Sequence, residues 1–420
     1  MADRIVQYRG DIRTELQEYE LKTATAQFLQ AENLNFLIGA GCSSHKDDSG
    51  EEKGIYGMKD LYRTFFKDYI KKSICDYIGG GMSEKELNHH FKEDLEKLLE
   101  YLDALAVVAQ CRRDLDTCGV DEQRRTIRRY LKKKILEGTE KPEVGAIYRE
   151  FYRRISQRSR KEPVSIFTTN YDMFSEAAMD DLGFLYNNGF TGTWRRKFNP
   201  LSYSYACVEN MNLRREAWEP VPFFFNLVKL HGSVSWYRGG AEAEDIFEGD
   251  CRRLADGAVG DDSDRTVMIY PTPMKDRSTL MTPYSDLFRV MENRLARKNT
   301  VLIVLGYSFR DPHINRVILN SLAVPSFQLV VFGVSEDIDS LIRLKDPRIT
   351  IIRTEGAKEG SDANVPDSRK IHYFKNFVER ALPEPGADMD ERRQLQKIDR
   401  LVRKYFQEEL QEKAQEEARQ

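Results

Sequence analysis

The chain has 420 residues, and its 65 Lys and Arg residues nearly balance its 68 Asp and Glu residues, for a formal net charge of −3. A length of this order can bury a large core and predicts two or three structural units. The balanced charge gives no global basic field, so direct nucleic-acid binding is not expected. The local basic run from Arg124 to Lys134 has the spacing of a solvated helix face.

Two further features concern the compartment. No apolar run is long enough to span a bilayer, and the N-terminal MADRIVQYRGDIR lacks the apolar centre of a signal sequence. The six cysteines are scattered without paired spacing, which indicates reduced thiols. We therefore expect a soluble, cytoplasmic protein without membrane contact.

The first strong pattern along the chain follows a segment, 12–31, whose apolar spacing predicts a helix. In residues 33–45, NLNFLIGAGCSSH, an apolar run breaks into Gly39-Ala40-Gly41, as a buried strand does when it enters a phosphate-cradling turn. The glycines would permit positive φ and a close backbone approach, and Ser43 would cap a following helix. An isolated G-x-G also fits an ordinary strand-to-helix turn, so both interpretations stay open here.

Residues 58–157 carry helical apolar stripes among many charges, which predicts a helical insertion of about 100 residues between two strands of a nucleotide fold. The segment 184–225 is rich in aromatic, Asn and Gly residues and predicts hairpins or long loops. Further strands are predicted at 267–273 and 329–335, with a helix at 284–298 between them.

Polar residues follow three more apolar strands, in IFTTNYD (166–172), VKLHGS (228–233) and VLIVLGYS (301–308). In open α/β sheets, ligands bind at the carboxyl ends of strands, so these segments and the glycine turn predict one shared cleft. By itself, an Asn after a strand is commonly a cap, and a lone His commonly packs. For Asp311 and His313, next to Pro312, we expect a helix cap and a packing residue.

Four segments resemble the sirtuins, the silent-information-regulator-like family: GAGCS, TTNYD, LHGS and LGYSFRD. They lie within about residues 30–335, in the family's order. The resemblance implies an α/β fold with a Rossmann-like, doubly wound parallel sheet, formed by 1–57 and 158–382 as an NAD-binding catalytic domain. The helical insertion domain would be 58–157.

The resemblance also implies residue roles. Asn170 would orient the ribose or a water molecule, Asp172 would bind the nicotinamide carboxamide, and His231 would act as general base. Contacts to NAD, the substrate, are implied for nine other positions: Gly39, Ala40, Gly41, Ser43, Thr169, Gly306, Ser308, Gly333 and Ser335.

One feature departs from the deacetylase sirtuins. Where those proteins carry two Cys-x-x-Cys pairs for zinc, the acidic segment 236–267 has only Cys251, so four thiolate ligands are absent. The departure implies no zinc and favours the largely bacterial branch that contains NAD hydrolases of anti-phage defence, which act as gated, NAD-depleting effectors. The alternatives are a protein deacylase or ADP-ribosyltransferase, and a non-catalytic NAD-binding scaffold subunit for an ATPase.

The last segment, 383–420, is rich in Glu, Gln, Arg and Lys with an apolar stripe, and predicts an amphipathic helical tail. Such a helix needs a partner face, so we expect either packing on the body, a homo-oligomer or a second protein. The chain has no G-x-x-x-x-G-K-[ST] motif. A HerA-like ATPase, or another defence subunit that the resemblance implies, would therefore be a separate chain.

Overall fold

The computed structural model describes residues 4–46, 52–68, 84–111, 117–156, 160, 162–212, 217–221, 223–239, 245–249, 266–268, 282–356, 362 and 365–384. Three predicted features therefore lie outside the described residues: the tail beyond Glu384, Cys251, and the strand end after Met268. Among the described helices, none is long and apolar enough to cross a membrane.

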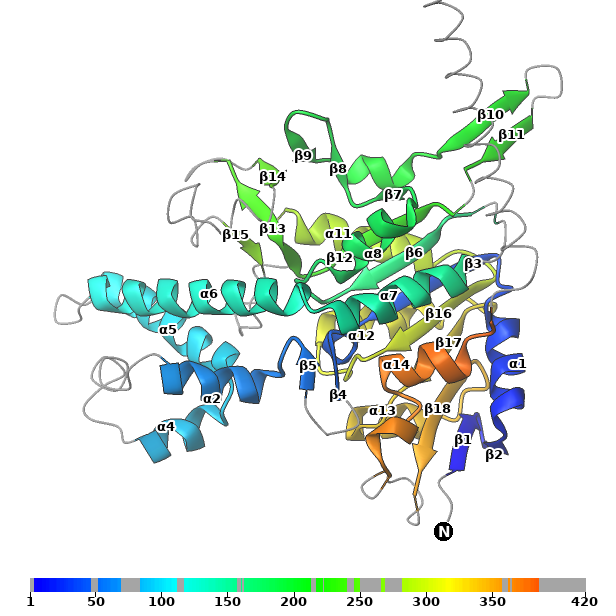
Figure 1. Cartoon of the computed structure of the whole chain (residues 1–420), viewed down its shortest axis with the longest axis horizontal. Helices are drawn as coiled ribbons and strands as arrows, with labels where there is room; N and C mark the ends of the chain where they lie inside the picture. The colour runs from blue at the N-terminus through cyan, green and yellow to red at the C-terminus, as the bar shows by residue number, and fades with distance from the viewer. Residues whose placement is uncertain are drawn as a thin grey trace, which may run out of the picture.

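The described part of the chain is organised around one large sheet (Figure 1). In spatial order its strands are β2 (Ile12–Leu16), β1 (Arg4–Arg9), β18 (Ile349–Glu355), β17 (Gln328–Phe332), β16 (Thr300–Leu305), β3 (Asn33–Ile38), β6 (Val164–Thr168), β12 (Phe225–Lys229) and β7 (Tyr186–Asn187). All neighbours pair in parallel except β1, which pairs antiparallel with both β2 and β18.

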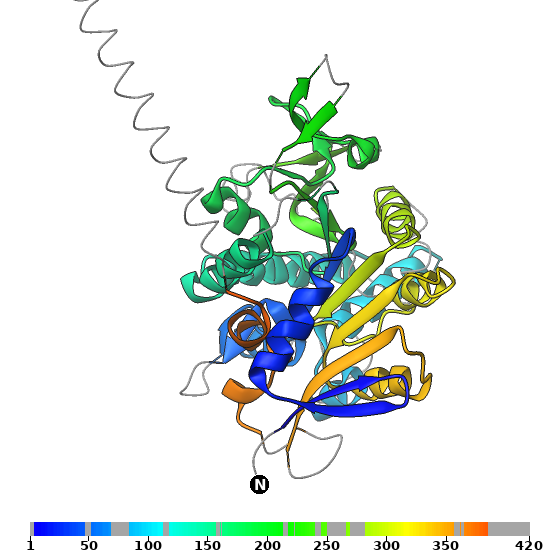
Figure 2. The ribbon, with the colours of Figure 1, turned by 90° about the vertical axis from the view of Figure 1, so that its right-hand side faces the viewer.

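The central strands are apolar runs because both of their faces are covered. In β3, Phe36 and Ile38 point into one core and Leu37 into the other. The first core is closed by α1 (Glu18–Phe28), α7 (Pro142–Ile155), α8 (Phe174–Leu182) and α14 (Phe374–Asn376). The second is closed by α11 (Tyr284–Leu295), α12 (Pro312–Ser321) and α13 (Glu336–Arg343), and the two groups lie on opposite sides of the sheet (Figure 2). The predicted doubly wound α/β fold is confirmed.

The helices follow in chain order. They are α1 (Glu18–Phe28), α2 (Met58–Asp68), α4 (Glu84–Phe91), α5 (Leu95–Cys111), α6 (Thr117–Thr139), α7 (Pro142–Ile155), α8 (Phe174–Leu182), α11 (Tyr284–Leu295), α12 (Pro312–Ser321), α13 (Glu336–Arg343) and α14 (Phe374–Asn376), which continues into a π-helical turn at Phe377–Ala381.

The helices between β5 (Glu52–Gly54) and β6 fall into two groups. A separate core holds α2, α4, α5 and α6 together, with Phe65, Leu98 and Tyr130 fully buried in it. In contrast, α7 packs on the sheet, where the rings of Phe151 and Phe36 meet edge to face at 5.2 Å. The division of the chain into domains stays a prediction, but this packing joins α7 to the sheet rather than to the other helices.

Smaller sheets lie beside the large one. The first, in spatial order, consists of β15 (Thr266–Met268), β13 (Gly232–Arg238), β14 (Ile246–Glu248), β9 (Arg196–Phe198) and β8 (Phe190–Thr191). Two hairpins are formed by β10 (Val208–Asn212) with β11 (Ala217–Pro220), and by β4 (Ser44–Lys46) with β5 (Glu52–Gly54). Ile135 of α6 packs on Val234 and Met268, so the long helix reaches this side of the molecule.

The prediction of a helix at 12–31 is wrong for its first residues. Residues 12–16 form β2, which turns back from β1 at Gly10, and the helix begins only at Glu18. Most of β2 is exposed or half-buried, so it lacks the apolar alternation that marks a strand. β2 is held by its antiparallel pairing with β1 and by a contact with a distant residue, in which Arg13 Nη2 donates to Glu355 Oε2 at 2.8 Å.

Candidate active site

The carboxyl edge of the sheet brings the four predicted strand ends together. β16, β3, β6 and β12 are consecutive neighbours, and their last residues are in register: Leu305 opposes Ile38, and Thr168 opposes both Ile38 and Lys229. The residues that follow therefore leave the sheet side by side. Gly39, Thr169, Leu230 and Gly306 occupy these positions.

The glycine turn after β3 differs from its expected form. Gly39 has φ −103, and Gly41 is not among the glycines with positive φ; the left-handed residue is Gly306, at φ +62. A Cβ at Gly39 would overlap the carbonyl oxygen of Gly306, and one at Gly306 would lie 2.7 Å from the Cys42 backbone nitrogen. These glycines allow two loops to pack backbone against backbone.

The expected helix after this turn is also absent. Ala40–Cys42 form a short 3-10 turn, and Ser44 starts β4. Ser43 therefore caps no helix, and its hydroxyl is used within the site.

Asn170, Ser43 and Asp172 form a buried hydrogen-bonded chain. Asn170 Nδ2 donates to the Gly39 carbonyl at 3.0 Å and to Ser43 Oγ at 2.9 Å, and Ser43 Oγ donates to Asp172 Oδ2 at 2.6 Å. Because the Gly39 carbonyl can only accept, the amide nitrogen of Asn170 must face it. Asn170 Oδ1 is then a buried acceptor without a hydrogen-bond partner in the described structure.

Burial of Asp172 makes ionisation of its carboxyl group less favourable than in water. Burial raises the pKa of the Asp172 carboxyl, while Lys229, the Ser43 hydroxyl and the Phe174 amide oppose that rise. Phe174 N donates to Asp172 Oδ1 at 3.2 Å, so both carboxylate oxygens have protein donors. No sequence pattern indicated that the charge of Lys229 would lower the pKa of this carboxyl.

Lys229 is buried beneath the site with a second carboxylate. Its ammonium group lies 2.7 Å from Glu176 Oε1, and the two side chains are 2% and 5% exposed. The same ammonium donates to Ser233 Oγ at 3.0 Å and to the Asp172 carbonyl. Lys229 thus connects β12, α8 and the start of β13 at the floor of the site.

His231, which follows β12, faces Asp311, which precedes α12. His231 Nε2 and Asp311 Oδ2 are 3.0 Å apart, and both side chains are buried. Asp311 Oδ1 accepts from the His313 amide at 3.0 Å, so the predicted cap of α12 is confirmed. Sequence reasoning missed the second role of Asp311, because the partner histidine comes from a different strand end.

A cavity of about 300 Å³ opens beside the glycine loops. Four predicted NAD contacts line it: Gly41, Gly306, Ser308 and Gly333. The structure adds residues that sequence reasoning missed, namely Ser44, His45, Glu52, Tyr307, Phe332, Val334, Ile338, His372 and Tyr373. Ser44, His45, Tyr307, Phe332 and Val334 lie within segments that the sequence patterns marked, but no role was assigned to them. Glu52, Ile338, His372 and Tyr373 come from other parts of the chain and carry no motif.

The remaining predicted contacts lie around this cavity without lining it. Ser335 accepts from the Ile338 amide at 3.2 Å and so caps α13. The amide of Thr169 donates to the Ile38 carbonyl at 3.2 Å, and Ala40 lies in the 3-10 turn. Their roles toward NAD stay predictions.

Among the residues that the structure describes, no group of three or more His, Cys, Asp or Glu side chains could hold a metal ion. Cys251 lies outside those residues. The expected lack of zinc therefore stays a prediction.

The fold and this edge define a class, the nucleotide-binding α/β proteins with a doubly wound sheet. The family described as the SIR2-like domain matches residues 164–352, which include Asn170, Asp172, His231 and Ser308 but not the glycine turn at 39–41. The match supports a sirtuin-like domain and, with it, NAD-dependent activity.

A solved structure similar to this chain is that of Sir2Tm bound to a propionylated peptide. It is 11% identical, the similarity covers 77% of this chain and 94% of that one, and the TM-score is 0.30. A search of curated proteins finds no match. The fold assignment therefore rests on the strand order and the two covered faces.

Proposed function

We propose that this protein hydrolyses NAD at the bond between nicotinamide and ribose, releasing nicotinamide and ADP-ribose. The observation that carries the proposal is the carboxamide of Asn170, 7% exposed, whose Nδ2 is fixed while its Oδ1 has no described hydrogen-bond partner. A buried acceptor without a donor costs about 1–3 kcal/mol. A ribose hydroxyl or a water molecule would supply the missing donor.

The chemistry needs a polar site that stabilises positive charge on the ribose. Nicotinamide leaves as a neutral molecule, a water oxygen bonds to the ribose carbon, and the proton of that water passes to His231. The carboxylate of Asp311 accepts a hydrogen bond from His231 Nε2, so the neutral imidazole carries its proton on Nε2 and its lone pair on Nδ1. The same carboxylate stabilises the imidazolium that forms. This pairing supports His231 as the general base.

The other members of the site would hold NAD in place. Asp172 has lone pairs beyond those used by Ser43 and Phe174, and it would accept from the nicotinamide carboxamide. Gly41, Gly306, Ser308 and Gly333 surround a cavity large enough for one nucleoside half of the dinucleotide. The adenosine half would lie there.

The biological role proposed is that of a gated effector in bacterial anti-phage defence. It rests on the resemblance to zinc-free, NAD-hydrolysing sirtuin-like proteins. Hydrolysis with water as acceptor would drain the NAD pool, so the activity would be held off until a trigger arrives. A homo-oligomer and a HerA-like ATPase or other defence subunit supplied as a separate chain are part of this proposal, as is a cytoplasmic location.

The test is incubation of the purified protein with NAD, with and without an acetylated peptide, followed by chromatography of nicotinamide, ADP-ribose and acetyl-ADP-ribose. We expect ADP-ribose without peptide, from the protein alone or together with its ATPase partner, and loss of this product in Asn170→Ala and His231→Ala. Asn35→Ala is the matched control, because Asn35 is a buried Asn of β3 that bonds carbonyls of Asn33 and Val301, away from the edge.

Three results would contradict the proposal. Acetyl-ADP-ribose formed only with peptide would assign a deacylase. Wild-type turnover in His231→Ala would remove its role as base. NAD binding without turnover, both alone and with the ATPase partner, would leave a scaffold subunit.

A further inference from the structure

A second cavity, of about 750 Å³, lies at the opposite, amino-terminal edge of the large sheet. Its lining includes Val164 and Phe225, the first residues of β6 and β12, and Arg297, which precedes β16. Ligands of open parallel sheets bind at the carboxyl edge, so this cavity is not the dinucleotide site of the fold. It is large enough for a ligand of its own.

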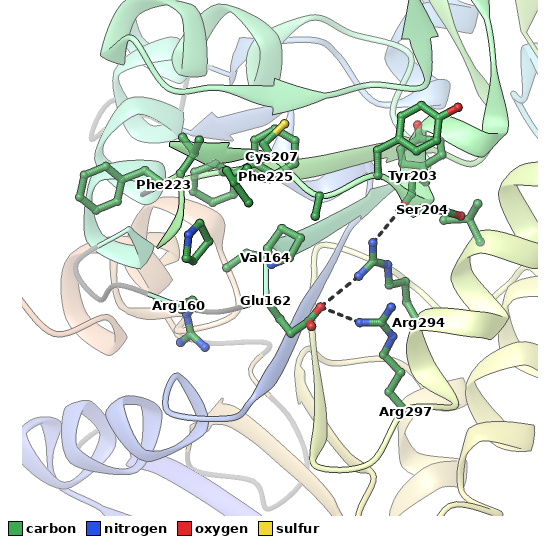
Figure 3. A pocket seen from close by; sticks show the side chains of 18 of the residues that line it. Arg160, Glu162, Val164, Tyr203, Ser204, Cys207, Phe223, Phe225, Arg294 and Arg297 are labelled. Atoms are coloured by element: carbon green, nitrogen blue, oxygen red, sulfur yellow. Dashed lines mark hydrogen bonds and ion pairs between the residues drawn. The ribbon is translucent and has the colours of Figure 1, made fainter. Parts of the chain in front are cut away.

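One side of the cavity carries more positive than negative charge (Figure 3). A single carboxylate oxygen, Glu162 Oε2, faces two guanidinium groups, at 2.7 Å from Arg297 Nη1 and 3.6 Å from Arg294 Nη1. Burial and the neighbouring charge of Arg297 lower the pKa of Arg294, with Glu162 opposing the shift. Arg160 adds a third guanidinium to the lining, bonded to the Ala31 carbonyl at 2.7 Å.

Of these guanidinium groups, that of Arg294 is held in place and is largely buried. Its Nη2 donates to the Tyr203 carbonyl at 2.8 Å, and its side chain is 11% exposed. A guanidinium that is fixed and largely desolvated binds an anion more strongly than a mobile surface one, because less side-chain freedom is lost.

The other side of the cavity is aromatic. Phe223, Phe224 and Phe225 line it, and Figure 3 places Phe223 and Phe225 across from Arg294 and Arg297. Tyr205 also lines the cavity and is 60% exposed. The ring of Phe223 is backed by Phe184 at a centroid distance of 5.5 Å. A nucleobase can stack on the faces of such rings.

We propose that this cavity binds a nucleotide, with its phosphate on Arg294 and Arg297 and its base against Tyr205 and Phe223. The ligand would neutralise the surplus positive charge and cover the exposed aromatic faces. This site goes beyond the proposed NAD hydrolysis and does not depend on it.

Cys207 provides a local readout, since it lines the cavity and its thiol is exposed. The experiment measures the rate at which N-ethylmaleimide alkylates Cys207 in the full-length protein, resolved by peptide mass spectrometry. The probes are AMP, GMP, CMP and UMP, compared with adenosine and with inorganic phosphate. Binding at the carboxyl edge would leave this rate unchanged.

We expect at least one monophosphate to slow alkylation of Cys207 several-fold, and adenosine or phosphate alone to slow it less. Arg297→Glu should abolish the protection; its side chain is 42% exposed, so the fold should tolerate the change. Arg289→Glu is the matched control, because Arg289 lies on α11, is 67% exposed and is outside the cavity lining. Tyr205→Ala should reduce protection by the nucleotide to the level given by phosphate.

The proposal is overturned if none of the four monophosphates protects Cys207 at millimolar concentration. It is equally overturned if protection persists unchanged in Arg297→Glu, or if adenosine alone protects as well as AMP. Circular dichroism of each variant confirms that the fold is retained, so a loss of protection reports the cavity.

Discussion

Lys229→Met should destabilise this protein strongly, because Lys229 pairs with the buried carboxylate of Glu176 and its charge also favours ionisation of the buried Asp172. Its ammonium pairs with Glu176 at 2.7 Å, donates to Ser233 Oγ, and its charge opposes the rise in the pKa of Asp172. Breaking a buried pair by removing one partner costs about 3–5 kcal/mol, since the other charge remains buried. We expect a loss in that range at pH 7.

The double variant Lys229→Met with Glu176→Gln tests the origin of this loss. Removing both charges of a buried pair is often near neutral. The Asp172 carbonyl and Ser233 still lose a donor, at about 1–3 kcal/mol, so the double variant should recover much but not all of the stability.

The assay is urea unfolding followed by tryptophan fluorescence, to which the buried Trp236 contributes. Lys197→Met is the control, because Lys197 pairs with Asp245 at 2.8 Å with both side chains about half exposed, and such pairs contribute about 0–1 kcal/mol. A loss in Lys229→Met no larger than that in Lys197→Met would show that Lys229 does not compensate a buried charge. A double variant as unstable as the sum of the two single variants would show the same.

The pH dependence of Lys229→Met gives an independent check. Burial raises the pKa of Glu176, and Lys229 lowers it, so loss of Lys229 raises that pKa further. A carboxyl group whose pKa is raised by folding destabilises the folded state as pH rises from its pKa in the unfolded chain to its pKa in the folded chain. The deficit of Lys229→Met should therefore be smaller at pH 5 than at pH 8.

Three further predictions concern the carboxyl edge. Asp311→Asn should keep the cap of α12 and change the melting temperature little, yet lower NAD turnover because the carboxylate behind His231 is lost; equal turnover would contradict the pairing. Gly306→Ala should cost at least about 1 kcal/mol more in urea unfolding than Gly183→Ala, since both have positive φ but only Gly306 would meet backbone atoms. Burial lowers the pKa of His372, so protonation of the unfolded chain should reduce stability as pH falls below 6.5, and His372→Gln should flatten that slope in pH-dependent melting curves.

Sequence patterns were sufficient for the parts of the site that follow apolar strands. The runs before Gly39, Thr169, His231 and Gly306 mark buried strands, and each polar residue that follows must leave the sheet at its carboxyl end. Parallel strands place these ends on one edge whatever their order, so a shared site could be predicted without knowing the strand order.

Local periodicity and turn chemistry in the sequence were therefore enough to predict the four strand ends and the cap at Asp311, and the resemblance to the sirtuins implied the α/β class. Three features became known only from the folded chain: Asp311 faces His231, Lys229 neutralises Glu176 beneath the site, and Gly39 and Gly306 serve loop packing. The position of the second cavity also became known only from the folded chain. Each of these depends on which distant segments become neighbours, and neighbours in a sheet are set by strand order and register, which no local pattern contains.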